Sequence, residues 1–93
     1  MDKEVIVVLK ALSDENRIKI FRLLKEHGER CACDLLEDLN IAQSTLSHHM
    51  KILVDCRLVN ARKNGKWINY TINKEVCSKI RNGIFELFDG SCC

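Results

Sequence analysis

The 93-residue chain contains no proline, no internal repeat, no low-complexity stretch and no composition shift that would mark a linker. We therefore expect one domain over residues 1–93, of which residues 88–93 form a loose, cysteine-containing tail. No apolar run approaches the ~20 residues that a membrane helix needs. The first residues also lack a basic segment followed by a long apolar one, which disfavours a secretory signal and predicts a cytoplasmic protein.

The six cysteines include no Cys-x-x-Cys pair, and strands do not alternate with helices along the pattern. Together with a size that leaves no room for a deep pocket, these absences argue against a small thiol enzyme such as a reductase. A secreted disulfide scaffold is also disfavoured, because such frameworks are loop-rich and need an oxidising compartment. We expect a non-enzymatic protein in a reducing cytoplasm, with free or metal-bound thiols and with Cys56 and Cys77 in structural roles.

Apolar side chains recur at helical spacing in five segments, which predicts helices over residues 3–12, 14–26, 32–39, 43–55 and 74–88. Ser13 offers a hydroxyl cap for the second helix, whose apolar stripe would include Ile18, and Gly28 follows its end. Gly83 lies inside the last helix. Glycine costs about 1 kcal/mol there relative to alanine unless another element packs closely against it.

Between the last two predicted helices, the apolar period changes from helical to alternating in segments 58–62 and 67–72. Asn64-Gly65 lies between these segments and is a strong hairpin signal, because a type I′ turn needs positive φ at both central residues. A mostly helical chain with a β-hairpin placed after the fourth helix indicates a winged helix-turn-helix fold.

Positive charge gathers in the middle of the chain. Residues 41–66 carry five Lys or Arg against one acid, a balance of +4, whereas residues 1–40 have a balance of −2. The second helix of a helix-turn-helix lies in the major groove and a basic hairpin contacts the backbone, so double-stranded DNA is the expected partner. The candidate contacts are Gln43, Ser44, Thr45, Ser47, His48, Lys51, Arg62, Lys63 and Lys66.

Two cysteines, Cys31 and Cys33, stand at the start of the predicted third helix. Successive helical residues turn by about 100°, so side chains two apart converge on one ion only where the helix has not begun or is partly unwound. The helix dipole there favours thiolate, which selects soft ions. As(III) or Sb(III), which take three sulfurs, are the first choice and Cd(II), Pb(II) or Zn(II) follow. The tail offers Cys92 and Cys93 as sources of a third sulfur.

Five motifs give the chain a family resemblance: Leu9-Lys10-Ala11-Leu12-Ser13-Asp14, Arg17-Ile18-Lys19-Ile20, Cys31-Ala32-Cys33-Asp34-Leu35, Gln43-Ser44-Thr45-Leu46-Ser47-His48-His49-Met50 and Arg62-Lys63-Asn64-Gly65-Lys66-Trp67. In these motifs the chain resembles the ArsR/SmtB family of winged-helix metalloregulatory repressors. Members are cytoplasmic homodimers on palindromic operators, and an inducer releases them from DNA. The resemblance implies a homodimer formed through the first and last helices, here residues 3–12 and 74–88.

Three features depart from the pattern of that family. Leu36 stands where the arsenic-sensing branch has a third cysteine, and Ala42 stands where relatives commonly have a capping Ser. The last helix also lacks the His of the family's zinc site. The resemblance implies a repressor that leaves its operator when As(III) or Sb(III) binds Cys31 and Cys33. A response to Cd(II), Pb(II) or Zn(II), or to thiol oxidation, stays open as an alternative.

Overall fold

The computed structural model describes residues 2–89. In chain order its elements are α1 (Lys3–Leu12), α2 (Glu15–His27), β1 (Arg30–Cys31), α3 (Ala32–Leu39), α4 (Gln43–Asp55), β2 (Val59–Asn64), β3 (Trp67–Ile72) and α5 (Lys74–Phe88). The prediction of a mostly helical chain with a β-hairpin wing is confirmed.

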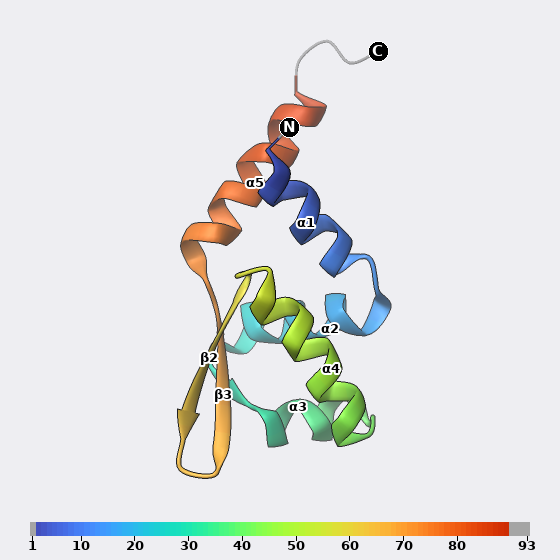
Figure 1. Ribbon diagram of the computed structural model, residues 1–93, viewed down its shortest axis with the longest axis vertical. Helices are drawn as coiled ribbons and strands as arrows, with labels where there is room; N and C mark the ends of the chain where they lie inside the picture. The colour runs from blue at the N-terminus through green and yellow to red at the C-terminus, as the bar shows by residue number, and fades with distance from the viewer. Residues whose placement is uncertain (1, 90–93) are drawn as a thin grey trace.

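The molecule is elongated, with a longest extent of 49 Å. Helices α1 and α5 lie side by side at one end, and the hairpin of β2 and β3 extends towards the other (Figure 1). Helices α2, α3 and α4 pack beside the hairpin. The α1–α5 pair and the hairpin tip are therefore separated by most of the length of the protein.

The sheet has three antiparallel strands in the order β1-β3-β2. The short strand β1 pairs with the middle of β3, Arg30 opposite Tyr70 and Cys31 opposite Asn69. Two residues are too few for any alternation to show in the sequence, so this strand was not predicted. Its consequence is that the segment leading into α3 is hydrogen-bonded to the wing.

The second helix differs from its prediction at its start and on its apolar face. Asp14, not Ser13, is its N-cap, and its carboxylate accepts a hydrogen bond from the backbone N–H of Arg17. The Ser13 hydroxyl instead donates to the carbonyl of Lys10 at the end of α1. Ile18, expected on the buried stripe, is 44% exposed. Ile20 enters the core instead, together with Leu24, which the predicted stripe also includes.

The hairpin turn is also different from the predicted one. Asn64 pairs with Trp67, so the two-residue loop is Gly65-Lys66 rather than Asn64-Gly65. Among the described residues of this loop, only Gly65 has positive φ, at +66°. Positive φ at the first central position alone is the pattern of a type II′ turn, which like type I′ matches the twist of the strands.

The hydrophobic core joins all five helices to the sheet. Its fully buried members include Val5, Val8, Ile20, Leu24, Leu35, Leu46, Leu53, Leu58 and Val59. In α4 the apolar residues Leu46, Met50 and Leu53, which recur at helical spacing, are buried. Phe88, where the predicted helix over 74–88 and the predicted tail meet, is the last residue of α5. Within residues 2–89, no helix is both long enough and apolar enough to cross a membrane.

Gly83 of α5 packs tightly against Val5 of α1. A Cβ built at this glycine would lie 2.8 Å from a methyl carbon of Val5, whose side chain is fully buried. Another element therefore does pack closely against this glycine, which is the condition under which a glycine is favoured inside a helix. The stiff, branched Val5 side chain has little freedom to move away.

We predict that Gly83→Ala lowers the free energy of unfolding, although alanine gains about 1 kcal/mol of helix propensity over glycine. Overpacking against Val5 is expected to cost more than this gain, on the order of 1–3 kcal/mol. In a Val5→Ala background the clash is absent, and Gly83→Ala should then stabilise by about 1 kcal/mol. Urea unfolding followed by circular dichroism measures both steps.

The neighbouring Asn82 is exposed, so Asn82→Ala is a matched control that should stabilise slightly in either background. An equal effect of Gly83→Ala in the two backgrounds would show that Val5 does not require the glycine.

Candidate functional site

Helix α4 has one buried and one exposed face. Leu46, His49 and Met50 point into the protein, whereas all six candidate DNA contacts of this helix are exposed: Gln43, Ser44, Thr45, Ser47, His48 and Lys51. Ala42 provides no side-chain hydrogen bond at the N-terminus of the helix. The first N–H groups of α4 are thus left for solvent or for an anion such as phosphate.

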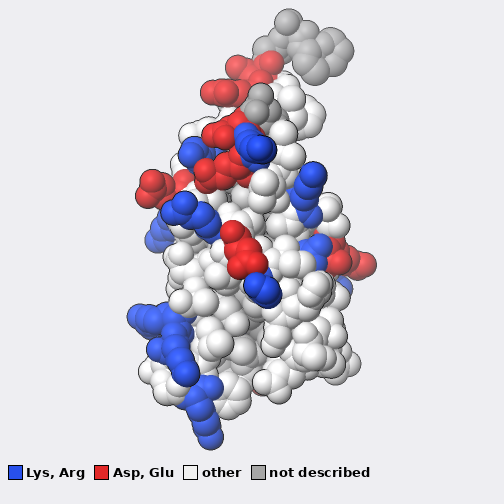
Figure 2. All heavy atoms as spheres, in the orientation of Figure 1, with Lys and Arg blue, Asp and Glu red and all other residues white. Residues whose placement is uncertain are grey.

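The three candidate contacts of the wing, Arg62, Lys63 and Lys66, are exposed as well. Figure 2 shows Lys and Arg side chains gathered over the hairpin, whereas acidic side chains gather towards the α1–α5 end. Side chains of α4 and of the sheet line a groove between them, with Ser47 and Lys51 on one side and Ala61 and Ile68 on the other. The structure therefore brings the predicted residues of α4 and of the wing to one end of the molecule.

Two of the candidate cations already have partners within the chain. The Lys51 ammonium lies 3.2 Å from the carboxylate of Asp55. The Arg62 guanidinium lies 2.6 Å from the carboxylate of Glu29, in the turn between α2 and β1. Lys63 and Lys66 form no ion pair with any described residue, so their full charge is available to a phosphate.

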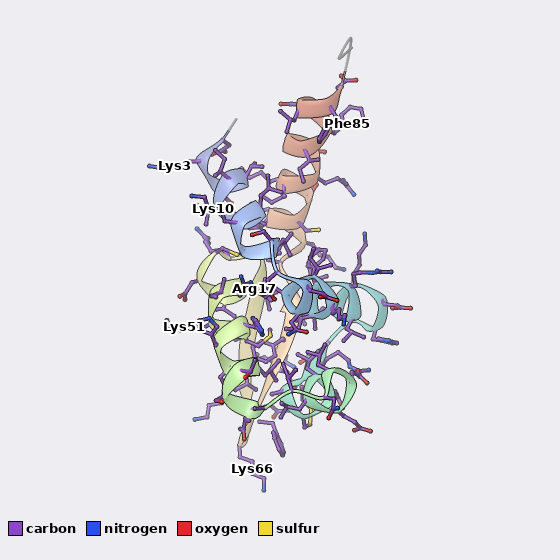
Figure 3. All side chains as sticks on the ribbon, turned by 90° about the vertical axis from the view of Figure 1, so that its right-hand side faces the viewer. Lys3, Lys10, Arg17, Lys51, Lys66 and Phe85 are labelled. Carbon is purple, nitrogen blue, oxygen red and sulfur yellow. A yellow bond between two sulfur atoms is a disulfide. The ribbon has the colours of Figure 1, made fainter. Side chains whose placement is uncertain are left out.

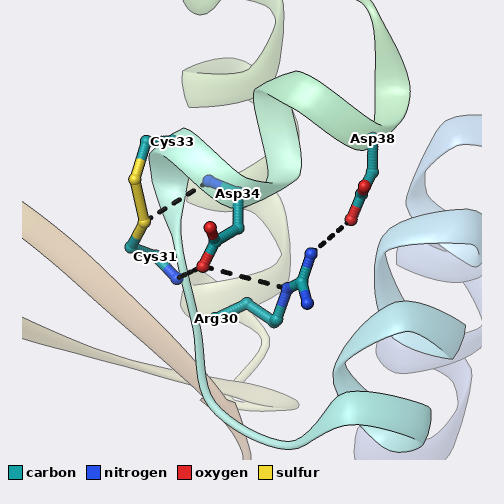
Figure 4. Close-up of a disulfide and its surroundings, with 5 residues drawn as sticks. All are labelled: Arg30, Cys31, Cys33, Asp34 and Asp38. Carbon is teal, nitrogen blue, oxygen red and sulfur yellow. Dashed lines mark hydrogen bonds and ion pairs between the residues drawn. A yellow bond between two sulfur atoms is a disulfide. The ribbon is translucent and has the colours of Figure 1, made fainter.

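Cys31 and Cys33 are joined by a disulfide (Figure 4). This corrects the expectation that both would be free or metal-bound thiols. Cys31 has extended backbone dihedrals at the N-cap of α3, which lets its sulfur turn towards Cys33 on the first turn. The bridge encloses a single residue, so it restrains the start of α3 and crosslinks no distant parts of the fold.

Asp34 completes this cluster. The Cys31 sulfur accepts a hydrogen bond from the Asp34 N–H at 3.3 Å, and the Asp34 carboxylate accepts one from the Cys31 N–H at 3.2 Å. Arg30 ion-pairs with Asp38 and lies 3.9 Å from Asp34, which ties β1 to α3 a second time. The spacing of Cys31 and Asp34 is that of a capping box, so the sequence already contained a signal for this contact.

The two sulfurs and a carboxylate oxygen of Asp34 lie within 4.8 Å of one another, the one such group of potential metal ligands within residues 2–89. Once reduced, the pair has the donors and the spacing to hold one soft ion. Cys92 and Cys93 lie outside the described residues. Cys56 is buried, with its thiol donating to the carbonyl of Leu53, and Cys77 is partly buried against the core, in agreement with structural roles.

The sulfur cluster is also part of the wing sheet. Cys31 lies opposite Asn69 of β3, and Asn69 lies opposite Arg62 of β2. These three residues therefore form one row across the sheet, in which neighbouring strands are about 4.8 Å apart. A change in backbone position at Cys31 is passed directly to a strand that carries a candidate DNA contact.

His49 is a buried residue of α4 whose contacts the sequence did not reveal. The Arg17 guanidinium donates to its Nδ1 at 3.1 Å, and the Asp14 carboxylate lies 3.8 Å from the same atom. Because an arginine can only donate, Nδ1 is the acceptor and the ring proton is on Nε2. Burial lowers the pKa of His49 below its usual value, and the nearby Asp14 offsets only part of this effect.

Residues 14–61 match the family model described as "Bacterial regulatory protein, arsR family". The chain is 50% identical over 82 residues to the arsenical resistance operon repressor of Staphylococcus xylosus, covering 88% of this chain and 78% of that protein. It is 38% identical over 72 residues to a cadmium resistance regulatory protein, a CadC homolog, of Staphylococcus aureus, covering 77% and 60%. The structure of HlyU from Vibrio cholerae superposes with a TM-score of 0.76 at 33% identity, covering 95% and 98%.

We predict that the neutral state of His49 makes stability depend on pH. Above about pH 6.5 the histidine is uncharged whether folded or unfolded, so its full contribution is present. As the pH falls further, the unfolded chain takes up a proton that the folded chain excludes, and the free energy of unfolding falls by at most about 1.4 kcal/mol per pH unit. Urea unfolding at a series of pH values should give a shallower dependence for His49→Asn than for the wild type.

The adjacent His48 is exposed, so His48→Asn serves as the control and should keep the wild-type dependence. Parallel stability curves for His49→Asn and the wild type would contradict a neutral, buried His49.

Proposed function

The chain belongs to the arsR family of bacterial regulatory proteins, and we propose that As(III) or Sb(III) is the inducer of this metal-responsive transcriptional repressor. The proposal is supported by its relatives, which include arsenical and cadmium resistance regulators. The proposal agrees with two expectations from the sequence, namely that the protein works in the cytoplasm and that it is not an enzyme.

In the DNA-bound state, α4 lies in the major groove and the wing lies along the backbone. Gln43, Ser44, Thr45, Ser47 and His48 are the side chains proposed to meet base edges and nearby phosphates. Lys63 and Lys66 contact phosphate with their full charge. Arg62 and Lys51 each exchange an internal carboxylate for a phosphate, which reduces the net gain from their contacts.

The other end of the molecule is proposed to form the homodimer. Helices α1 and α5 expose large apolar side chains there: Ile6, Val7, Phe85, Leu87 and Phe88. Phe85 is 65% and Phe88 69% exposed, and Figure 3 shows Phe85 at the end of the molecule opposite to Lys66. Burying such a patch against a second copy is favourable. A two-fold dimer of this shape presents two wings to a palindromic operator.

The inducer site is proposed to be the reduced pair Cys31 and Cys33. One observation carries this assignment: Cys31 is at once the last residue of β1 and the N-cap of α3. Two thiolates select soft ions. As(III) and Sb(III) are favoured over Cd(II), Pb(II) and Zn(II) because the chain is 50% identical to an arsenical resistance operon repressor and 38% identical to a cadmium resistance regulator. Cys92 or Cys93 is proposed to supply the third sulfur.

Release from DNA follows from the two roles of Cys31. The Cys31 sulfur keeps the hydrogen bond from the Asp34 N–H while it is bonded to Cys33. An ion held between the two reduced sulfurs requires a different sulfur position, which pulls the Cys31 sulfur from that N–H and weakens the capping box that starts α3. The strain reaches α4 through its packing on α3, and reaches the wing through the pairing of β1 with β3. Both parts of the DNA surface are displaced by the one event.

A second candidate trigger is oxidation of the same two thiols, and the Cys31–Cys33 disulfide specifically favours it. The pair closes when the two thiols give two protons and two electrons to an oxidant such as peroxide, which becomes water. Both triggers act on the same residue at the start of α3, so the chain has one responsive element with two candidate inputs.

We predict that reduced protein leaves its DNA when about one equivalent of As(III) per site is added, because the ion needs both thiolates. Cys31→Ser/Cys33→Ser should bind DNA equally well and stay bound. Cys77→Ser is the matched control and should respond like the wild type. Fluorescence anisotropy of a labelled duplex, selected by the wild-type protein from a random library, follows each titration.

Release of the double variant by As(III) would remove this pair from the site. Parallel titrations with Sb(III), Cd(II), Pb(II), Zn(II) and peroxide rank these agents by the concentration at which each releases the protein from DNA. A Cys92→Ser/Cys93→Ser variant with unchanged As(III) affinity would show that the tail provides no ligand.

We also predict that Lys63→Ala/Lys66→Ala lowers the salt dependence of DNA binding. Each lost phosphate contact reduces the slope of log K against log salt by about 0.9, so the slope should fall by roughly 2 for each subunit, or roughly 4 for the proposed dimer. Lys3 and Lys10 on α1 lie far from the wing (Figure 3). Lys3→Ala/Lys10→Ala removes the same charge and should leave the slope nearly unchanged. Equal slopes for the two double variants would contradict the proposed role of the wing.

A further inference from the structure

The contacts of Arg17 join three helices at one point. Its Nε donates to the carbonyl of Ala11 near the end of α1, and its backbone N–H is held by Asp14, the N-cap of α2. Its Nη1 donates to His49 of α4. Figure 3 places Arg17 in the middle of the molecule, between the α1–α5 end and the wing.

His49 is an unusual choice for the inward face of α4. It is 7% exposed and is the one buried polar residue within the described part of the chain. The neighbouring inward positions, Leu46, Met50 and Leu53, are apolar. Burying an imidazole costs free energy that a leucine would not require. An apolar contact permits small rotations and shifts of a helix, whereas a hydrogen bond from a tethered guanidinium restricts both direction and distance.

We propose that His49 is a positioning residue for DNA binding, which through its bond with Arg17 holds α4 at the height and rotation that its exposed side chains need to read the major groove. The proposal rests on the proposed DNA-binding function. His48, directly before it, is exposed on the DNA side with its ring centroid 5.9 Å from that of His49. The two adjacent histidines thus have different roles: His48 is exposed towards DNA, and His49 fixes α4 to Arg17 of α2.

The charges around His49 make the neutral ring the competent form. Arg17 and His48 are the basic groups that face it, and Asp14 is the acidic group. A protonated ring cannot accept from Arg17 at Nδ1 and places a second positive charge 3.1 Å from the guanidinium. Asp14, at 3.8 Å, would then compete for the ring. Acidification should therefore loosen α4 from α2 without removing any DNA contact.

The test compares two substitutions at one position. In His49→Asn the side-chain oxygen stands where Nδ1 accepts from Arg17, whereas His49→Leu fills the space without an acceptor. We expect His49→Leu to lose about tenfold in affinity for the selected duplex, the scale of one good base contact. Its affinity for random-sequence duplex should change by less than about twofold, because phosphate contacts do not require an exact helix position. His49→Asn should keep most of the specific affinity.

The pH profile separates positioning from a merely structural role. From about pH 7.5 to about pH 5.5 the wild type should lose more specific affinity than His49→Asn, whose side chain does not titrate. Thermal unfolding by circular dichroism confirms that each variant is folded at the assay temperature. If His49→Leu does not fold, the comparison of His49→Asn with the wild type decides the matter.

Unchanged specific affinity of a folded His49→Leu, or parallel pH profiles of His49→Asn and the wild type, would overturn the proposal. A wild-type protein that selects no duplex at all would instead overturn the DNA-binding function itself.

Discussion

Cys31 is the residue on which the proposed response depends. Its backbone ends β1, its sulfur caps α3 by accepting from Asp34, and the same sulfur is bonded to Cys33. The sulfur accepts from Asp34 while it is bonded to Cys33, but an ion held by both thiolates requires a different sulfur position, so binding of the ion competes with the cap. A reaction or ion binding at the Cys31 sulfur is therefore coupled directly to the backbone. Strand β1 of the wing sheet ends at Cys31, and α3 begins at the next residue.

The start of α3, where this response occurs, differs from two more tightly held regions of the fold: the α1–α5 contact and the contacts of Arg17. At one end, α1 and α5 approach closely because Gly83 has no side chain to hold them apart. In the middle, Arg17 bonds to α1 and to His49 of α4. The start of α3 has no comparable packing: Cys31, Cys33 and Asp34 are only partly buried. A local change there costs less than a change in the core, which suits a switch.

Much of this architecture could be predicted from the sequence. Four of the five helices have the predicted bounds, because their apolar stripes are regular. Errors arose where local signals competed. Ser13 and Asp14 are both good N-caps; Asp14 caps α2, whereas the Ser13 hydroxyl bonds to the end of α1. Asn64-Gly65 and Gly65-Lys66 are both acceptable two-residue loops, and pairing of Asn64 with Trp67 selects the second.

The sequence by itself determined the order of elements, the exposed polar face of α4, the basic wing and the presence of two adjacent thiols at a helix start, since all of these follow from local spacing. Only the tertiary structure decided what β1 and His49 touch. The pairing of β1 with the wing and the bond between Arg17 and His49 join residues far apart in the chain. Such contacts depend on how helices and strands pack in three dimensions, and spacing along the chain carries no record of them.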